Sequence, residues 1–99
     1  MKITVCELPS EPADLADACP RLINHVTHRE SELVLLPEMP FYRWLSQTNE
    51  VEPSEWGKSV RAQEEWLTLL DELATATVIS SRPVVDDCIR RNVGFVWEQ

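Results

Sequence analysis

The stretch Leu33-Val34-Leu35-Leu36-Pro37-Glu38 decides the fold of this chain. Four consecutive apolar residues are too few for a helix and predict a strand buried on both faces, as in parallel sheets. Pro37 ends the strand because proline has no N–H to donate to a neighbouring strand. Glu38 is therefore predicted to lie at the carboxyl end of a buried strand, the edge at which open α/β sheets build their sites.

The pair Pro37-Glu38 also has a simpler interpretation, in which it only starts the next turn and Glu38 serves a helix N-terminus. The residues that follow it are unusually large. Phe41, Tyr42 and Trp44 either line a substrate pocket beside Glu38 or belong to the core or a subunit contact, and the sequence leaves both possibilities open. We expect the Glu38 carboxylate to be partly buried in a cleft near Phe41 or Tyr42.

Length and composition limit the possible classes of protein. The chain has 99 residues, enough for one small domain, and its 43% hydrophobic and 26% charged residues are typical of a folded protein. A formal net charge of -8 argues against a nucleic-acid partner and against an anionic membrane surface, because both would repel the chain. The N-terminus has no apolar signal region, and no apolar run approaches the ~20 residues that span a bilayer. We expect a cytoplasmic protein.

The cysteines and histidines do not form a recognisable metal or disulfide pattern. Cys6, Cys19 and Cys88 are odd in number and widely spaced, which fits reduced thiols better than disulfides or a zinc site. His25 and His28 lie on one predicted helix without a third ligand at a convincing spacing, so we interpret them as surface or boundary residues. No metal and no cofactor are expected.

The chain before the central strand predicts a strand and a helix. Alternating β-branched residues indicate a strand over 2–7. A helix over 13–30 follows, with the Ser10 hydroxyl as the expected cap and Pro12 in the first turn. Pro20 predicts either a kink near residue 16 or a helix that begins near Cys19. One apolar stripe is expected on this helix: Leu15, Cys19, Leu22 and Val26.

After a surface excursion over 46–55, the remaining chain predicts a second helix over 56–74 and two strands, 77–81 and 92–97. One face of the helix is expected to be apolar: Val60, Leu67, Leu70 and Ala74. Arg82-Pro83 is expected to end the third strand and to begin a turn-rich connection over 84–91. The order β-α-β-α-β-β predicts an α/β fold with one sheet, both helices on the same side and an apolar opposite face.

With this order the chain resembles the nitrilase (carbon–nitrogen hydrolase) superfamily over its whole length. The matching features are the first strand, the helix leading into 32–38, the helix before 77–81 and the last strand, which opens with Asn92. The family's first catalytic motif is an apolar strand that runs into Pro-Glu, and here that residue is Glu38. The resemblance implies that residues 1–99 are the N-terminal part of such a domain, half of an α-β-β-α four-layer sandwich, cut before the domain is complete.

Members of this family hydrolyse nitriles, amides or carbamoyl groups, or transfer acyl groups, with a Glu-Lys-Cys triad. The cysteine attacks carbon, the glutamate is the general base, and the lysine stabilises the tetrahedral intermediate. The family's lysine and cysteine lie downstream of the strand that ends this sequence. The resemblance therefore implies a hydrolase of small-molecule amides or nitriles in which only Glu38 is present, so that these residues alone are inactive.

A second hypothesis is a truncated relative without catalysis, which works as an assembly or interaction module. It would bury its open sheet face against a partner or against itself, and a homo-oligomer is expected for either hypothesis. The coding sequence beyond Gln99 distinguishes them: a strand that continues to a lysine and then a cysteine supports the hydrolase, and a stop codon supports the assembly module.

Overall fold

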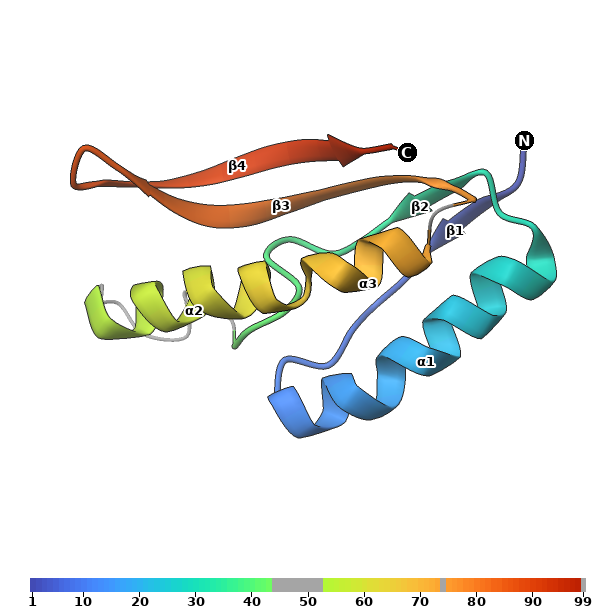
Figure 1. The fold of residues 1–99 in the computed structure, drawn as a ribbon, viewed down its shortest axis with the longest axis horizontal. Coiled ribbons are helices and arrows are strands. Elements are labelled where there is room, and N and C mark those ends of the chain that lie inside the picture. The colour runs from blue at the N-terminus through green and yellow to red at the C-terminus, as the bar shows by residue number, and fades with distance from the viewer. Residues whose placement is uncertain (44–52, 74, 99) are drawn as a thin grey trace.

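Four strands form one mixed sheet. The computed structural model describes residues 1–43, 53–73 and 75–98. In chain order, its elements are β1 (Ile3–Val5), α1 (Pro12–Arg29), β2 (Leu33–Leu35), α2 (Pro53–Glu65), α3 (Leu67–Glu72), β3 (Thr77–Asp86) and β4 (Ile89–Trp97). The strand order is β1-β2-β3-β4, with β1, β2 and β3 parallel and β4 antiparallel to β3 (Figure 1). The predicted α/β class and order of elements are confirmed, except that the second helix is split in two.

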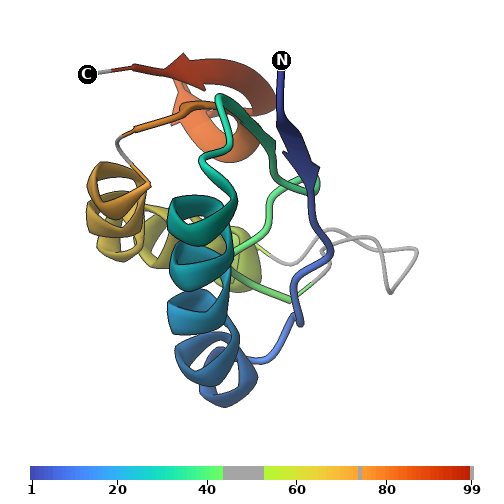
Figure 2. The same ribbon diagram turned by 90° about the vertical axis from the view of Figure 1, so that its right-hand side faces the viewer.

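All helices cover the same face of the sheet, as predicted (Figure 2). Side chains alternate along a strand, so Val34 and Val78 enter the core between sheet and helices while their neighbours face the other way. On the opposite face, four apolar side chains are exposed: Ile3 (53%), Val5 (73%), Ile79 (40%) and Val96 (60%). This second surface is called the open face below, and its apolar character matches the prediction.

Helix α1 buries the stripe predicted for it: Leu15, Cys19, Leu22 and Val26. Burial of each large apolar side chain contributes about 1.5–3 kcal/mol, which together outweighs the ~3 kcal/mol cost of Pro20 inside the helix. The helix begins at Pro12, so a start near Cys19 is wrong. Its N-cap is Glu11 without a side-chain cap hydrogen bond, so the cap expected from Ser10 is also wrong.

The second predicted helix is interrupted at Trp66, between α2 and α3. The interruption does not change the buried face, because Ser59, Gln63 and Leu70 are spaced as i, i+4 and i+11 and so form one helical stripe. The buried residues are Ser59 and Gln63 on α2 and Leu69 and Leu70 on α3. Of the predicted apolar face, Leu70 is buried, Val60 and Leu67 are half-buried, and Ala74 lies outside the described residues.

Strands β3 and β4 form a hairpin that runs through Pro83. Asp87 and Cys88 make its turn with φ of 47° and 64°, the left-handed conformation of a type I′ turn. Counted from the closing pair Asp86–Ile89, the pair Pro83–Asn92 is a non-hydrogen-bonded one, so β4 needs no N–H from Pro83. The predicted strand end at Arg82-Pro83 and the turn-rich connection over 84–91 are therefore wrong.

Candidate functional site

Glu38 lies just beyond the carboxyl end of β2, in a segment fastened to β3. Leu36 N donates to Ile79 O at 3.0 Å, and Met39 N donates to Ser81 Oγ at 3.1 Å. Met39 has a φ of 43°, a left-handed conformation that turns the chain sharply after Glu38. Glu38 is thus held between two anchored residues at the edge of the sheet where the parallel strands end.

The Glu38 carboxylate is held by one side chain of β4. Asn92 Nδ2 donates a hydrogen bond to Glu38 Oε1 at 2.6 Å. Glu38 is exposed, so the partial burial expected for its carboxylate is wrong for the described residues. An oriented, solvated carboxylate has the chemistry to accept a proton from a nearby donor.

The aromatic residues after Glu38 turn toward the helices. Phe41 is 1% exposed and stacks on Trp66, with ring centroids 5.9 Å apart and an interplanar angle of 21°. Tyr42 is buried too, and its hydroxyl donates to Glu55 Oε2 at 2.7 Å. Trp44 lies outside the described residues. The structure therefore places Phe41 in the core, one of the alternatives that the sequence left open.

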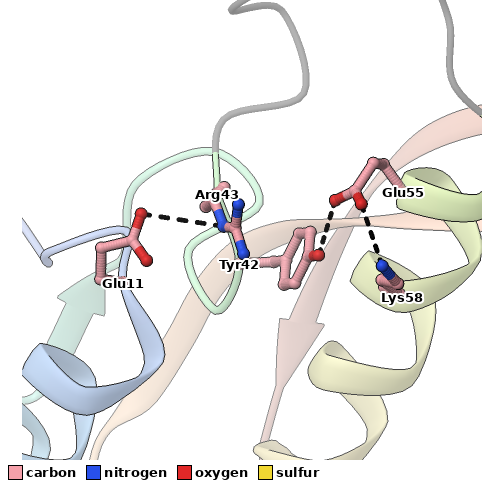
Figure 3. A network of polar contacts seen from close by, with 5 residues as sticks. All are labelled: Glu11, Tyr42, Arg43, Glu55 and Lys58. Atoms are coloured by element: carbon pink, nitrogen blue, oxygen red, sulfur yellow. Dashed lines mark hydrogen bonds and ion pairs between the residues drawn. The ribbon is translucent and has the colours of Figure 1, made fainter.

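Tyr42 belongs to a polar network that connects the segment after Glu38 with the start of α1 and with α2 (Figure 3). Glu55 also accepts from Lys58 Nζ at 3.1 Å, the Arg43 guanidinium lies 5.8 Å from the Tyr42 ring centroid, and Arg43 Nε is 3.7 Å from Glu11 Oε1. The hydrogen bond to Glu55 raises the pKa of Tyr42, and the same bond, with Lys58, lowers the pKa of Glu55. Sequence reasoning missed Glu55, although its spacing from Lys58 is that of a helical ion pair.

A cavity of about 230 Å³ lies on the helix side of this loop. Phe41, Tyr42 and Trp66 form part of its wall, with Lys58 and Arg61 beside them. Glu38 is not among the lining residues. The predicted site residues are therefore divided between two places, the sheet edge at Glu38 and the cavity at Phe41 and Tyr42.

Two of the three thiols, those of Cys6 and Cys19, are poorly suited to nucleophilic attack. Burial, together with the nearby Cys19, raises the pKa of Cys6 to about 11, and Cys6 Sγ donates to Leu35 O at 3.5 Å. Burial also raises the pKa of Cys19. Cys88 is exposed in the hairpin turn, and all three thiols are free. A raised pKa leaves little thiolate at neutral pH, and the thiolate is the nucleophile.

The described ranges contain no group of three or more His, Cys, Asp or Glu side chains that could hold a metal ion. No helix in these ranges is long and apolar enough to cross a membrane.

Comparison with known proteins returns no match: no family model, no curated protein and no solved structure matches the chain.

Proposed function

We propose that this chain is the N-terminal portion of a carbon–nitrogen hydrolase of the nitrilase type. In it, Glu38 is the general base of a Glu-Lys-Cys mechanism that cleaves a non-peptide amide, nitrile or carbamoyl bond. The observation that carries the proposal is the placement of Glu38 at the carboxyl end of β2, with its carboxylate oriented by Asn92. Both residues belong to the sequence features on which the resemblance rests.

The role of Asn92 follows from the hydrogen bond. An amide donor on one carboxylate oxygen fixes the rotation of the side chain and leaves the other oxygen to accept a proton. The bond joins the segment that follows β2 to a residue of β4, so its geometry depends on how that segment and β4 are both held against β3. Asn92 is accordingly a positioning residue, and it would not itself contact substrate.

The lysine and the nucleophile must come from outside these residues. Lys2 precedes β1, at the amino end of the strands, and Lys58 is paired with Glu55. Cys6 and Cys19 are held as neutral thiols by burial, and Cys88 lies in the turn of the β3–β4 hairpin. Glu38 alone would supply only the share of general-base catalysis, typically ~10²–10⁴-fold.

A second candidate function is assembly, and the open face favours it. Ile3 and Val5 on β1, Ile79 on β3 and Val96 on β4 expose apolar area on one face of the sheet, a pattern that marks interaction surfaces on soluble proteins. In this alternative the chain is a non-catalytic relative that forms homo-oligomers. The two candidates agree on the fold and differ on whether Glu38 takes part in chemistry.

The first test combines sequence with an assay of residues 1–99 alone. For the hydrolase, we expect the coding sequence to continue to a lysine and then a cysteine, and we expect these residues alone not to turn over simple amides or nitriles. Genuine turnover that disappears when Cys6, Cys19 or Cys88 is replaced by alanine would overturn the proposal that the nucleophile lies elsewhere. A stop codon after Gln99 would favour the assembly module.

A further inference from the structure

Strand β1 presents an unpaired edge. It stands at the end of the strand order, so its outer side has no strand partner in the described part of the chain (Figure 2). Lys2 O accepts from Glu32 N at 2.8 Å and Cys6 N donates to Leu35 O at 3.2 Å, so these residues are turned toward β2. Because alternate residues bond to the same neighbour, the N–H and C=O groups of Ile3 and Val5 face outward. Such a row of donors and acceptors can pair with another strand.

A groove runs along this edge, between β1 and α1. Two cavities of about 490 and 350 Å³ lie next to each other there and share Thr4 and His25 in their walls. We call the two together the β1–α1 groove. One wall is residues 2–8, and the α1 wall includes Arg21, His25, His28 and Arg29. The groove therefore combines an open strand edge with a facing helix.

The charge of the groove is opposite to that of the chain as a whole. Its walls carry Lys2, Arg21 and Arg29 against one carboxylate, Glu7, in a chain of net charge -8. The ion pairs Lys2–Glu30 (3.8 Å) and Arg21–Asp17 (3.3 Å) are well exposed and so contribute little stability. The partial negative charge of the last carbonyls of α1 is offset by basic residues in its last turn. The groove thus suits an acidic ligand.

We infer that the β1–α1 groove binds an extended acidic peptide, which adds as a further strand to the edge of β1. Strand geometry determines the chemistry of the peptide, because successive side chains of an added strand point to opposite faces. One set would face α1 and meet Arg21, His25, His28 and Arg29. The other set would lie beside Ile3 and Val5, which are exposed on the open face. The preferred peptide therefore alternates acidic and apolar β-branched residues.

This inference does not rest on the proposed function. The groove does not include Glu38, and strand addition at β1 requires no catalysis. Loss of Glu38 should leave peptide binding unchanged, and loss of peptide binding should leave the role of Glu38 unchanged.

The test is a binding titration with a labelled heptapeptide of alternating valine and glutamate, followed by fluorescence anisotropy. We expect binding that weakens with added salt, and no binding by a matched peptide with lysine in place of glutamate. The double variant Arg21→Glu and Arg29→Glu should weaken binding by at least about tenfold, since it reverses charge across the groove. Arg90→Glu, on β4, is the matched control and should not weaken it. Equal binding of both peptides, or no effect of the double variant, would overturn the inference.

Amide hydrogen exchange on the unmodified chain gives an independent readout of strand addition. Saturating acidic peptide should slow exchange of the Ile3 and Val5 amides, which face outward, by about tenfold or more if they become paired with a stable strand. Binding without this protection would show an attachment through charge alone and would contradict strand addition.

Discussion

At the residue scale, the hydrogen bond between Tyr42 and Glu55 makes stability depend on pH at both ends of the scale. The pKa of Glu55 is lowered below 4.5. The ionised Glu55 carboxylate therefore contributes to the free energy of unfolding above pH 4.5, and this contribution is lost as pH falls through the lowered pKa. The pKa of Tyr42 is raised above 10.0. The protonated Tyr42 hydroxyl therefore contributes to the free energy of unfolding below pH 10.0, and this contribution is lost as pH rises through the raised pKa.

The corresponding prediction is that Tyr42→Phe reduces stability near neutral pH and flattens both arms of this pH dependence. The variant removes the hydroxyl and keeps the ring, so packing is preserved. Urea denaturation at several pH values measures the effect, with Lys58→Gln as a control that leaves the Tyr42–Glu55 bond in place. An unchanged alkaline arm in Tyr42→Phe would contradict the assignment.

Phe41 is the residue whose role the structure changes most. Because it is 1% exposed and stacked on Trp66, Phe41→Ala should lower the free energy of unfolding by about 3–5 kcal/mol. Ile89→Ala, at an exposed position, should cost about 1 kcal/mol or less. If urea denaturation gives both variants the same small loss, Phe41 is not a core residue and a role in a substrate pocket regains support.

The candidate site was only partly predictable from the sequence, for a reason at this same scale. The apolar run before Pro37 determines that Glu38 follows a strand, because that pattern depends only on neighbours in sequence. Its exposure and its bond to Asn92 depend on the sharp turn at Met39 and on the register of β4, which no local pattern contains. The turn directs Phe41 and Tyr42 to the helices and so leaves Glu38 uncovered.

At the element scale, helix α2 contains a glycine that its conformation does not require. Gly57 lies inside the helix without a positive φ, and an added Cβ would meet only Arg61 Nη1 at 3.6 Å, an ordinary contact. Gly57→Ala should therefore raise the free energy of unfolding by about 0.5–1 kcal/mol, because alanine loses less backbone entropy on folding. Ala62→Gly in the same helix should lower it by a similar amount. A loss of stability in Gly57→Ala, measured by urea denaturation, would contradict the helical assignment.

Elements with a strong internal pattern were predicted well, and elements whose form depends on neighbours were not. The stripe on α1 repeats over three turns and correctly identifies its buried face. The end of β3 was wrong because Pro83 is harmful only where an N–H is needed. In the pairing of β3 with β4, the position of Pro83 does not have to donate an N–H to Asn92. On the other side of β3, the pairing with β2 ends at Ile79, before Pro83 is reached. The buried face of α2 was missed because its two buried residues, Ser59 and Gln63, are polar and carry no apolar pattern.

At the scale of the whole molecule, the open face predicts association. Ile3, Val5, Ile79 and Val96 are 40% to 73% exposed on this one face, and apolar side chains gathered on a surface mark interaction sites. We expect residues 1–99 to sediment as a dimer or larger assembly at tens of micromolar concentration. Val96→Lys should shift the distribution toward monomer, whereas Ile89→Lys, at the hairpin end, should not. A stable monomer of the unmodified chain would contradict this prediction.

The central claim is that Glu38 is a general base, and one measurement tests it most directly. In the longer hydrolase that the proposal requires, the kcat of Glu38→Gln is compared with that of the unmodified enzyme, with Glu32→Gln, at an exposed position before β2, as the matched control. Glutamine keeps the shape and loses the basic oxygen, so the account predicts a fall of about 10²–10⁴-fold in kcat, with an unchanged circular dichroism spectrum. A Glu38→Gln enzyme that is folded and turns over substrate at a rate near that of Glu32→Gln would contradict it.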